Sequence, residues 1–282
     1  MALVFADRLK PGLDLSISAE KASQPHESVS YQLLGRGILA NNGCEANIFY
    51  DTGLRKPGSR HELEGTNDMQ IQMIAVGMNA LFLDNWGLDR SFAPPDMDTT
   101  PSLNLIPSMC HPLSRGTISL RSANPFEHPV IRANYMTDED NYDEECMLDC
   151  MRVVRDKVVK APALAAVIDG PLYLNDPDVP EPSYDDDEYL RSMLHNFTLT
   201  IYHPVGTCRM GGDDAAVVDP RLRVRGVKGL RVCDASVMPH LISGNTNAPT
   251  MMIGEKGAEM IIQDELAALE GALAEDSQQA RL

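Results

Sequence analysis

The stretch YHPVGTCRMG at residues 202–211 carries more information about fold and function than any other part of this 282-residue chain. A second stretch follows it and reads VCDASVMP at residues 232–239, then GNTNAPT at residues 244–250. Both set polar side chains capable of chemistry among glycine, proline and small residues. Such a composition is typical of rigid loops whose backbone approaches a ligand closely. We therefore expect the functional residues in these loops.

The composition is that of a globular protein with an acidic surface. Hydrophobic residues make up 43% of the chain, and the formal net charge is −17 at pH 7. This charge disfavours nucleic acids and anionic membranes as partners, because both bind basic surfaces. No apolar run approaches the roughly 20 residues of a membrane span, and the N-terminal residues lack the apolar core of a signal peptide. These features predict a soluble, intracellular protein without a transmembrane segment.

The six cysteines do not form the pattern of a disulfide framework in a chain of this length. Cys146 and Cys150 stand four residues apart, so they would share one face of a helix. No neighbouring cysteine or histidine pair completes a zinc set beside them. We expect buried thiols at these positions and no metal site.

Several elements can be predicted from residue periodicity. β-type patterns predict strands at 69–76, 103–109 and 116–121, and residues 29–34 are compatible with a further strand. Apolar residues at 147, 151, 154 and 158 form one helical face, which predicts a long helix from near Asp138 that Pro162 limits. We also expect a helix over 186–196, a short strand over 230–233 and a last helix from Pro249 to about Leu273.

The segment GRGILA at residues 35–40 fits the G-x-G-x-x-A form of a dinucleotide fingerprint. That fingerprint requires a helix to open within it. Asn41, Asn42 and Gly43 follow at once and would stop such a helix. A loop is therefore the favoured interpretation.

Three residues in the informative stretches could carry chemistry. His203 precedes Pro204, which disfavours helical geometry, and a histidine fixed in such a loop could accept a proton near neutral pH; a lone histidine is still more often structural, and His111 also precedes a proline. Asn245 offers both a donor and an acceptor to an alcohol oxygen, or it caps the next helix. Asp234 could bind ribose or ribityl hydroxyls, or cap the following turn.

The order of the motifs resembles the C-terminal signature of the glucose-methanol-choline (GMC) family of flavin oxidoreductases. The resemblance rests on HPVGTCRMG, then VVD at 217–219, GLRV at 229–232, DASVMP at 234–239, GNTNAPT at 244–250 and IGEK at 253–256. Weaker similarity extends upstream, at 114–126, 129–131, 134–136 and 35–46. It therefore covers most of the chain.

The resemblance implies roles for particular residues. His203 matches the catalytic histidine of the family, and Asn245 matches a second catalytic position that is asparagine in choline-oxidising members. Asp234 and Ala235 match residues that touch the ribityl–pyrophosphate part of FAD. Asn247 and Ala248, with Asn245, match the segment beside the isoalloxazine ring.

The resemblance also implies a reaction. His203 would remove the hydroxyl proton of a small alcohol, and Asn245 would hold the developing alkoxide. The substrate carbon would then release a hydride to flavin N5, giving an aldehyde or ketone. An electron acceptor, which could be oxygen, a quinone or a carrier protein, would reoxidise the flavin.

One feature of the family is missing from this sequence. Family members hold FAD mainly in an N-terminal doubly wound domain that opens with a G-x-G-x-x-G turn. We therefore expect a C-terminal fragment that is inactive alone and needs an N-terminal FAD-binding half. The alternative is a non-catalytic remnant of the substrate cap that binds a ligand or a partner.

The expected fold class is α+β. Residues 1–68 are expected to be a loop-rich segment bordering the substrate domain, and residues 69–200 to be that domain, with an antiparallel sheet and helices. Residues 201–265 would supply catalytic loops, a strand and a helix to the FAD domain. Residues 266–282 would form a tail that is disordered beyond Glu275.

Overall fold

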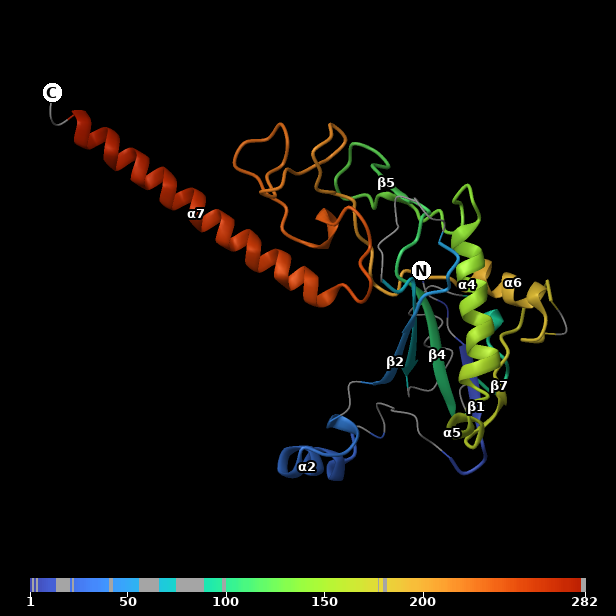
Figure 1. The fold of residues 1–282 in the computed structure, drawn as a ribbon. Coiled ribbons are helices and arrows are strands. Elements are labelled where there is room, and N and C mark those ends of the chain that lie inside the picture. Colours follow the sequence, from blue (N-terminus) through green and yellow to red (C-terminus); the bar gives the residue numbers. More distant parts are fainter. Residues whose placement is uncertain are drawn as a thin grey trace. The chain divides into compact units, whose positions relative to one another are not determined.

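The computed structural model describes residues 1, 3, 5–13, 21, 23–40, 43–55, 66–74, 89–97, 100–176, 178–179 and 182–279. Its contacts divide the chain into two compact units (Figure 1). The first unit comprises Met1–Gly116 and Ile131–Ile201, and the second comprises Thr117–Val130 and Tyr202–Leu282. Each unit has a hydrophobic core of its own.

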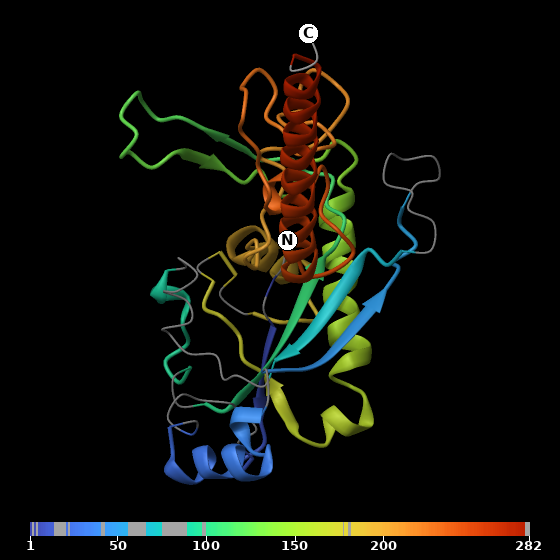
Figure 2. The ribbon, with the colours of Figure 1, turned by 90° about the vertical axis from the view of Figure 1, so that its left-hand side faces the viewer.

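An antiparallel sheet forms the centre of the first unit. Its spatial order is β2-β3-β4-β1-β7, and every pairing is antiparallel (Figure 2). The strands are β1 (Phe5–Leu9), β2 (Cys44–Tyr50), β3 (Met69–Ile74), β4 (Ser102–Met109) and β7 (Ile168–Pro171). The strands predicted at 69–76 and 103–109 are confirmed as β3 and β4, although residues 75–76 lie outside the described part of the chain. This sheet and its helices confirm the α+β class.

Helices pack on this sheet and close the core. Helix α4 (Tyr142–Val153) contacts β3, β4 and helix α6 (Asp187–Phe197). The buried face of α4 includes Met147 and Met151, and a π-helical turn continues it with the buried Val154. The predicted apolar face is therefore confirmed. Burial of this face stabilises the first unit, because each large apolar side chain that is buried adds about 1.5–3 kcal/mol.

The ends of these helices follow capping rules. The carboxylate of Asp138 accepts hydrogen bonds from the Tyr142 and Asp143 amides, at 2.7 and 3.2 Å. Asp138 therefore lies before α4 and satisfies amides in its first turn. Asp186 caps α6 in the same way, accepting from the Glu188 amide at 2.9 Å, which confirms the helix predicted over 186–196. Pro162 is at the start of the short helix α5 (Pro162–Ala165).

The strand considered for residues 29–34 is wrong. Those residues belong to helix α2 (Pro25–Leu34), which has proline at its start and ends at Gly35 with φ 60°. Proline at the first turn and a left-handed glycine after the last turn are helix start and stop signals. A short 3₁₀ turn (Ile38–Ala40) follows, so the loop interpretation of the GRGILA segment is confirmed and no strand leads into it.

The first 68 residues contain more regular structure than their sequence indicates. They were expected to be loop-rich, yet they supply β1 and β2 to the sheet. Strand β1 carries Asp7 and Arg8, and β2 exposes Ile48 and Phe49. Charged residues in a buried strand and apolar residues on an edge strand both obscure the alternation on which strand prediction depends.

The second unit consists mostly of loops around one helix. Val218, Leu222 and Val237 form its buried core, and α7 (Asn247–Gln279) contributes the partly buried Ile253 and Met260. The strand expected over 230–233 is wrong, because within the described residues only an isolated bridge between Arg223 and Arg231 forms there.

The last helix and the strand predicted at 116–121 both differ from the prediction in their bounds. Helix α7 starts two residues before Pro249 and continues through Gln279, so the residues beyond Glu275 that are described are helical and not disordered. The strand predicted at 116–121 is confirmed as the shorter β5 (Thr117–Ser119). It pairs with β6 (Val130–Arg132) in a separate two-stranded sheet.

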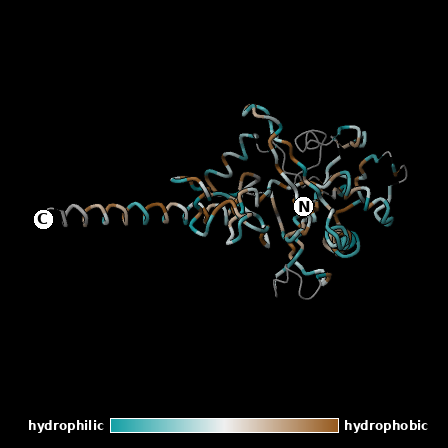
Figure 3. Tube along the Cα trace, turned by 90° about the horizontal axis from the view of Figure 1, so that it is seen from above, coloured by the Kyte–Doolittle hydropathy of each residue, from teal (hydrophilic) through white to brown (hydrophobic). Residues whose placement is uncertain are grey.

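Hydrophobic and hydrophilic positions alternate along α7 (Figure 3), and many of its apolar side chains are exposed. Among the described residues, no helix combines the length and apolar character that crossing a membrane requires.

The cysteines of α4, Cys146 and Cys150, are fully buried as predicted, and burial raises the pKa of the Cys146 thiol to about 12. These thiols are therefore protonated at neutral pH and are poor nucleophiles.

The close approach of α7 to its core gives a first prediction. A Cβ added at Gly257 would lie 2.6 Å from the Cys233 Sγ and 3.0 Å from its Cβ, whereas Gly254 has no such neighbour within 4 Å. Gly257→Ala should lower the free energy of unfolding by roughly 1–3 kcal/mol through overpacking. Gly254→Ala, the matched control, should be neutral or stabilising by up to about 1 kcal/mol. Urea unfolding measures both, and equal effects would contradict this packing.

Asp7 gives a second prediction. It lies on β1 between Leu103 and Pro171 with 2% of its surface exposed, and no hydrogen bond to its Oδ2 forms within the described residues. Burial raises the pKa of this carboxyl to about 7. A carboxyl whose pKa is higher in the folded state takes up a proton on folding, so stability is full at low pH and decreases between about pH 4 and pH 7.

Asp7→Asn should therefore remove most of this decrease and raise the free energy of unfolding at pH 8 by roughly 1–4 kcal/mol. Urea unfolding at a series of pH values measures the change. Asp169→Asn on β7 is the control, because the side chain of Asp169 is exposed. A wild-type pH dependence in Asp7→Asn would show that Asp7 is ionised in the folded protein.

Candidate functional site

The backbone before His203 is unusual. Ile201 and Tyr202 both have positive φ values, of 49° and 62°. Residues with a Cβ rarely occupy this region, and a β-branched residue there is a clear outlier that costs about 1–3 kcal/mol. Together with Pro204, this geometry fixes the direction in which the chain presents His203.

His203 contacts the second informative loop directly. Its Nδ1 lies 2.8 Å from the Thr246 Oγ1, and its side chain is also hydrogen-bonded with the side chain of Asn245. Two candidate residues that lie 42 positions apart in the sequence are therefore neighbours within the second unit. Asn245 is exposed and His203 is half-buried, so the pair is accessible from solvent.

The surroundings of His203 favour a neutral imidazole. Burial lowers the pKa of His203 below its usual value, and hydrogen bonds with the Asn245 side chain and the Tyr202 backbone oppose that shift. A neutral imidazole has a lone pair on one ring nitrogen, so it can accept a proton. His203 is therefore a candidate base at neutral pH.

Backbone hydrogen bonds join the loop of His203 to the loop of Asp234. The Cys208 amide donates to the Ser236 carbonyl at 3.0 Å, and the Met210 amide donates to the Val237 carbonyl at 2.8 Å. Gly206 has a φ of 90°, and a Cβ there would lie 3.4 Å from the Met238 carbonyl oxygen. The conformation of the His203 loop therefore depends on glycine at this position.

Asp234 caps a short turn. Its Oδ1 accepts hydrogen bonds from the amide and the hydroxyl of Ser236, at 2.8 and 2.5 Å, at the start of a 3₁₀ turn (Ala235–Val237). The capping alternative considered from the sequence is thus observed. The side chain is also exposed, so its carboxylate remains accessible to a ligand.

The start of α7 lies beside His203. Thr246, and not Asn245, immediately precedes the helix, and its carbonyl accepts from the Thr250 amide at 3.0 Å. The amides of Asn247 and Ala248 come before this first helical bond, and both residues are exposed. Free amides and the helix dipole stabilise negative charge at such an end.

Thr246 was missed as a contact of His203. Its side chain is 6% exposed, whereas Asn245 and Asn247 on either side are exposed. The signal available in the sequence was its position three residues before the helix predicted from Pro249, since threonine hydroxyls make local hydrogen bonds at helix starts. Sequence reasoning favours asparagine over threonine as a site residue because its amide offers more hydrogen-bonding groups.

His111, which also precedes a proline, does not join this site. His111 is buried in the first unit, with 5% of its surface exposed. His26, His128 and His240 are exposed, and His61 lies outside the described residues. Within the described part of the chain, no cluster of three histidine, cysteine or acidic side chains could hold a metal ion.

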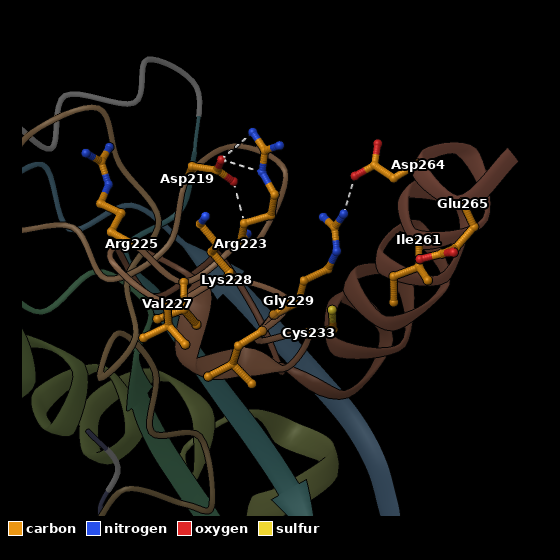
Figure 4. Close-up of a pocket in the computed structure, with 13 residues that line it drawn as sticks. Asp219, Arg223, Arg225, Val227, Lys228, Gly229, Cys233, Ile261, Asp264 and Glu265 are labelled. Atoms are coloured by element: carbon orange, nitrogen blue, oxygen red, sulfur yellow. Dashed lines mark hydrogen bonds and ion pairs between the residues drawn. The ribbon is translucent and has the colours of Figure 1, made fainter. Parts of the chain in front are cut away.

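A cavity of about 700 Å³ lies between α7 and the preceding loops of the second unit (Figure 4). None of the candidate residues lines it, although Cys233 beside Asp234 does. Of the three arginines that line it, two bind carboxylates: Arg223 binds Asp219 at 2.8 Å, and Arg231 binds Asp264. Arg225 donates to the Gly211 carbonyl at 2.7 Å. Because the cavity holds none of the candidate residues, the candidate site is the exposed surface around His203.

The pKa of His203 gives a third prediction. The hydrogen bond with Asn245 raises this pKa against the effect of burial. Asn245→Leu should therefore lower the pKa of His203 further, as measured by NMR titration of the imidazole. Asn247→Leu is the matched control and should leave the titration unchanged. An unchanged pKa in Asn245→Leu would contradict the hydrogen bond.

Comparison with known proteins places these features in a family. The family model described as GMC oxidoreductase matches residues 112–254. An alcohol dehydrogenase [acceptor] from Pseudomonas putida is 43% identical over 163 residues, which are 57% of this chain and 28% of that protein. An oxygen-dependent choline dehydrogenase from Escherichia coli is 43% identical over 148 residues, which are 52% of this chain and 25% of that protein.

The fold has solved counterparts. A formate oxidase variant from Aspergillus oryzae, solved to study FAD modification, matches with a TM-score of 0.71 and 24% identity. The match covers 93% of this chain and 46% of that protein. The chain therefore spans less than half the length of the proteins to which it is compared here.

Proposed function

Because the chain belongs to the GMC oxidoreductase family, we propose that it is the C-terminal part of an FAD-dependent enzyme that oxidises an alcohol to an aldehyde or ketone. The observation that carries the proposal is the His203–Asn245 pair. It combines a neutral, half-buried imidazole with an exposed amide on adjoining loops. Without a redox reaction, nothing in the fold requires both groups at one accessible position.

His203 is the proposed base. Its neutral imidazole accepts the hydroxyl proton of the alcohol, and the strained backbone at Ile201 and Tyr202 keeps the ring in place while it does so. Asn245 is the proposed partner of the substrate oxygen. Its amide can donate a hydrogen bond to that oxygen as negative charge develops.

Residues beside this pair fit FAD, and Asp234, Asn247 and Ala248 among them are exposed. The carboxylate of Asp234 can accept hydrogen bonds from ribityl hydroxyls, with Ala235 next to it. The amides of Asn247 and Ala248 at the start of α7, and the side chain of Asn245, can face the electron-rich part of the ring system. When bound, FAD would accept the hydride that leaves the alcohol carbon.

The proposed enzyme needs more protein than this chain. The regions that the matched relatives share with this chain make up only 28% and 25% of those proteins. Many apolar side chains of α7 are exposed, namely Met251, Met252, Ile261, Ile262, Leu266, Leu269 and Leu273. An N-terminal FAD-binding half would both supply the remaining flavin contacts and cover apolar surface. We therefore propose that the isolated chain is inactive.

The substrate and the electron acceptor are proposed only as classes. A relative named choline dehydrogenase is 43% identical over 148 residues, and asparagine at position 245 agrees with a choline-like or other small alcohol. The names of the relatives refer to an acceptor or to oxygen. Oxygen, a quinone and a carrier protein therefore remain the candidate electron acceptors.

The alternative function is a non-catalytic cap that binds a ligand or a partner. The short span of the chain relative to its relatives favours this alternative. The visible absorbance of the chain after FAD addition and gel filtration tests whether this chain has a flavin site. Retained flavin supports a flavin site in this chain, whereas alcohol binding without any flavin reduction, even with an FAD-binding half added, supports the cap.

The role of His203 gives a fourth prediction. In enzyme assembled from this chain and its FAD-binding half, His203→Ala should slow anaerobic flavin reduction by alcohol roughly a hundredfold or more, since that is what general base catalysis contributes. Stopped-flow absorbance measures the rate. His128→Ala is the matched control, because His128 is exposed and far along the chain from the site. Near-normal flavin reduction in His203→Ala would exclude it as the base.

A further inference from the structure

Thr246 is the buried residue of the loop that faces His203. Its side chain is 6% exposed, while its neighbours Asn245 and Asn247 are exposed. Its hydroxyl lies 2.8 Å from the Nδ1 of His203, which is hydrogen-bonding distance. The two exposed asparagines can contact ligands, whereas the buried threonine contacts His203 instead.

Both partners of this contact are held by other interactions. The Thr246 carbonyl accepts from the amide of Thr250 at 3.0 Å and from its hydroxyl at 2.6 Å, which anchors Thr246 to the first turn of α7. His203 follows two residues in the left-handed region and precedes a proline. The backbone segments that carry the hydroxyl and the ring are therefore both restricted in conformation, which keeps the two groups in contact.

A neutral imidazole carries one hydrogen, on either Nδ1 or Nε2, and the group that binds one nitrogen decides which form is populated. A threonine hydroxyl can donate or accept, so the distance alone permits both arrangements. Nδ1 is in contact with Thr246, so a lone pair on Nδ1 would not be available to a substrate. Asn245 is the other side chain that hydrogen-bonds with the ring, and because it is exposed, a substrate oxygen can take its place at Nε2. A base at this position requires the lone pair on Nε2.

We infer that Thr246 is a positioning residue whose hydroxyl accepts a hydrogen bond from Nδ1–H of His203 and so keeps the lone pair on Nε2. This inference rests on the proposed function, which requires His203 to act as a base. It goes beyond that function by naming the tautomer and the group that fixes it.

This arrangement suits proton transfer. When Nε2 takes up a proton, the Nδ1–H bond to Thr246 is kept, so no group has to turn. The opposite tautomer would present an N–H to the substrate and would require the threonine hydroxyl to reverse. The positive end of α7, one residue beyond Thr246, opposes a permanent charge on the ring and favours the neutral form.

The test reads the tautomer without measuring activity. The 282-residue chain labelled with ¹⁵N-histidine would be studied by long-range ¹H–¹⁵N NMR above the His203 pKa, with His203→Gln used to assign the ring. We expect a protonated Nδ1 and an unprotonated Nε2 in the wild type. An unprotonated Nδ1 would overturn the inference, whatever any variant does.

Two variants extend the test. Thr246→Val keeps the shape of the side chain but removes the hydroxyl, so it should shift His203 towards the Nε2–H tautomer. Thr246→Ser keeps the hydroxyl and should retain the wild-type tautomer. If Thr246→Val kept the wild-type tautomer, Thr246 would not be the group that fixes it. Should Thr246→Val fail to fold, Thr246→Ala, which also lacks the hydroxyl, makes the same test.

In enzyme assembled with its FAD-binding half, Thr246→Val should lower kcat by about tenfold or more with a smaller change in KM, and Thr246→Ser should restore most of it. A loss confined to KM would contradict a positioning role. If the wild type showed the expected tautomer but never reduced flavin, the proposed function would fail while the assignment of Nδ1–H would stand.

Discussion

The second unit depends on the backbone hydrogen bonds that join two loops, from Cys208 to Ser236 and from Met210 to Val237. This unit contains no extended sheet within its described residues, and its buried core is small. These two bonds set the register between the loop that carries His203 and the loop that carries Asp234. Helix α7 then brings Thr246 and Asn245 to the ring through its contact with the same core. Without that register, the candidate residues would belong to separate loops.

Much of the first unit was predictable because its signals are local. Strands β3 and β4 follow apolar runs, and α4 and α6 follow helical periodicity with aspartates at their starts. The predictions failed where tertiary contacts override local pattern. Strand β1 carries Asp7 into the core, and Val232 and Cys233 belong to the hydrophobic cluster that includes residues of α7 without forming a strand. Neither outcome can be read from a single segment, because its partners lie far away in the sequence.

The candidate site was predictable to the level of its loops and of the pair His203 and Asn245. Their proximity follows from the family resemblance, and the structure brings them together. The contact of Thr246 was not predictable, since the direction of a side chain at the entry of a helix depends on backbone angles that the sequence does not specify. Whether these residues act as proposed is a question for the complete enzyme.

The left-handed pair Ile201 and Tyr202 has an evolutionary consequence. Glycine at either position would relieve the backbone strain, and a stability-driven selection would therefore find such substitutions readily. It would also let the backbone before His203 adopt many conformations, so the ring would be within hydrogen-bonding distance of Thr246 for less of the time. Proteins that no longer needed a fixed orientation of the His203 ring could accept glycine at these two positions. Proteins that still needed it would keep the strained residues. In this chain, the strained pair thus favours a fixed direction of the His203 ring at a cost in stability.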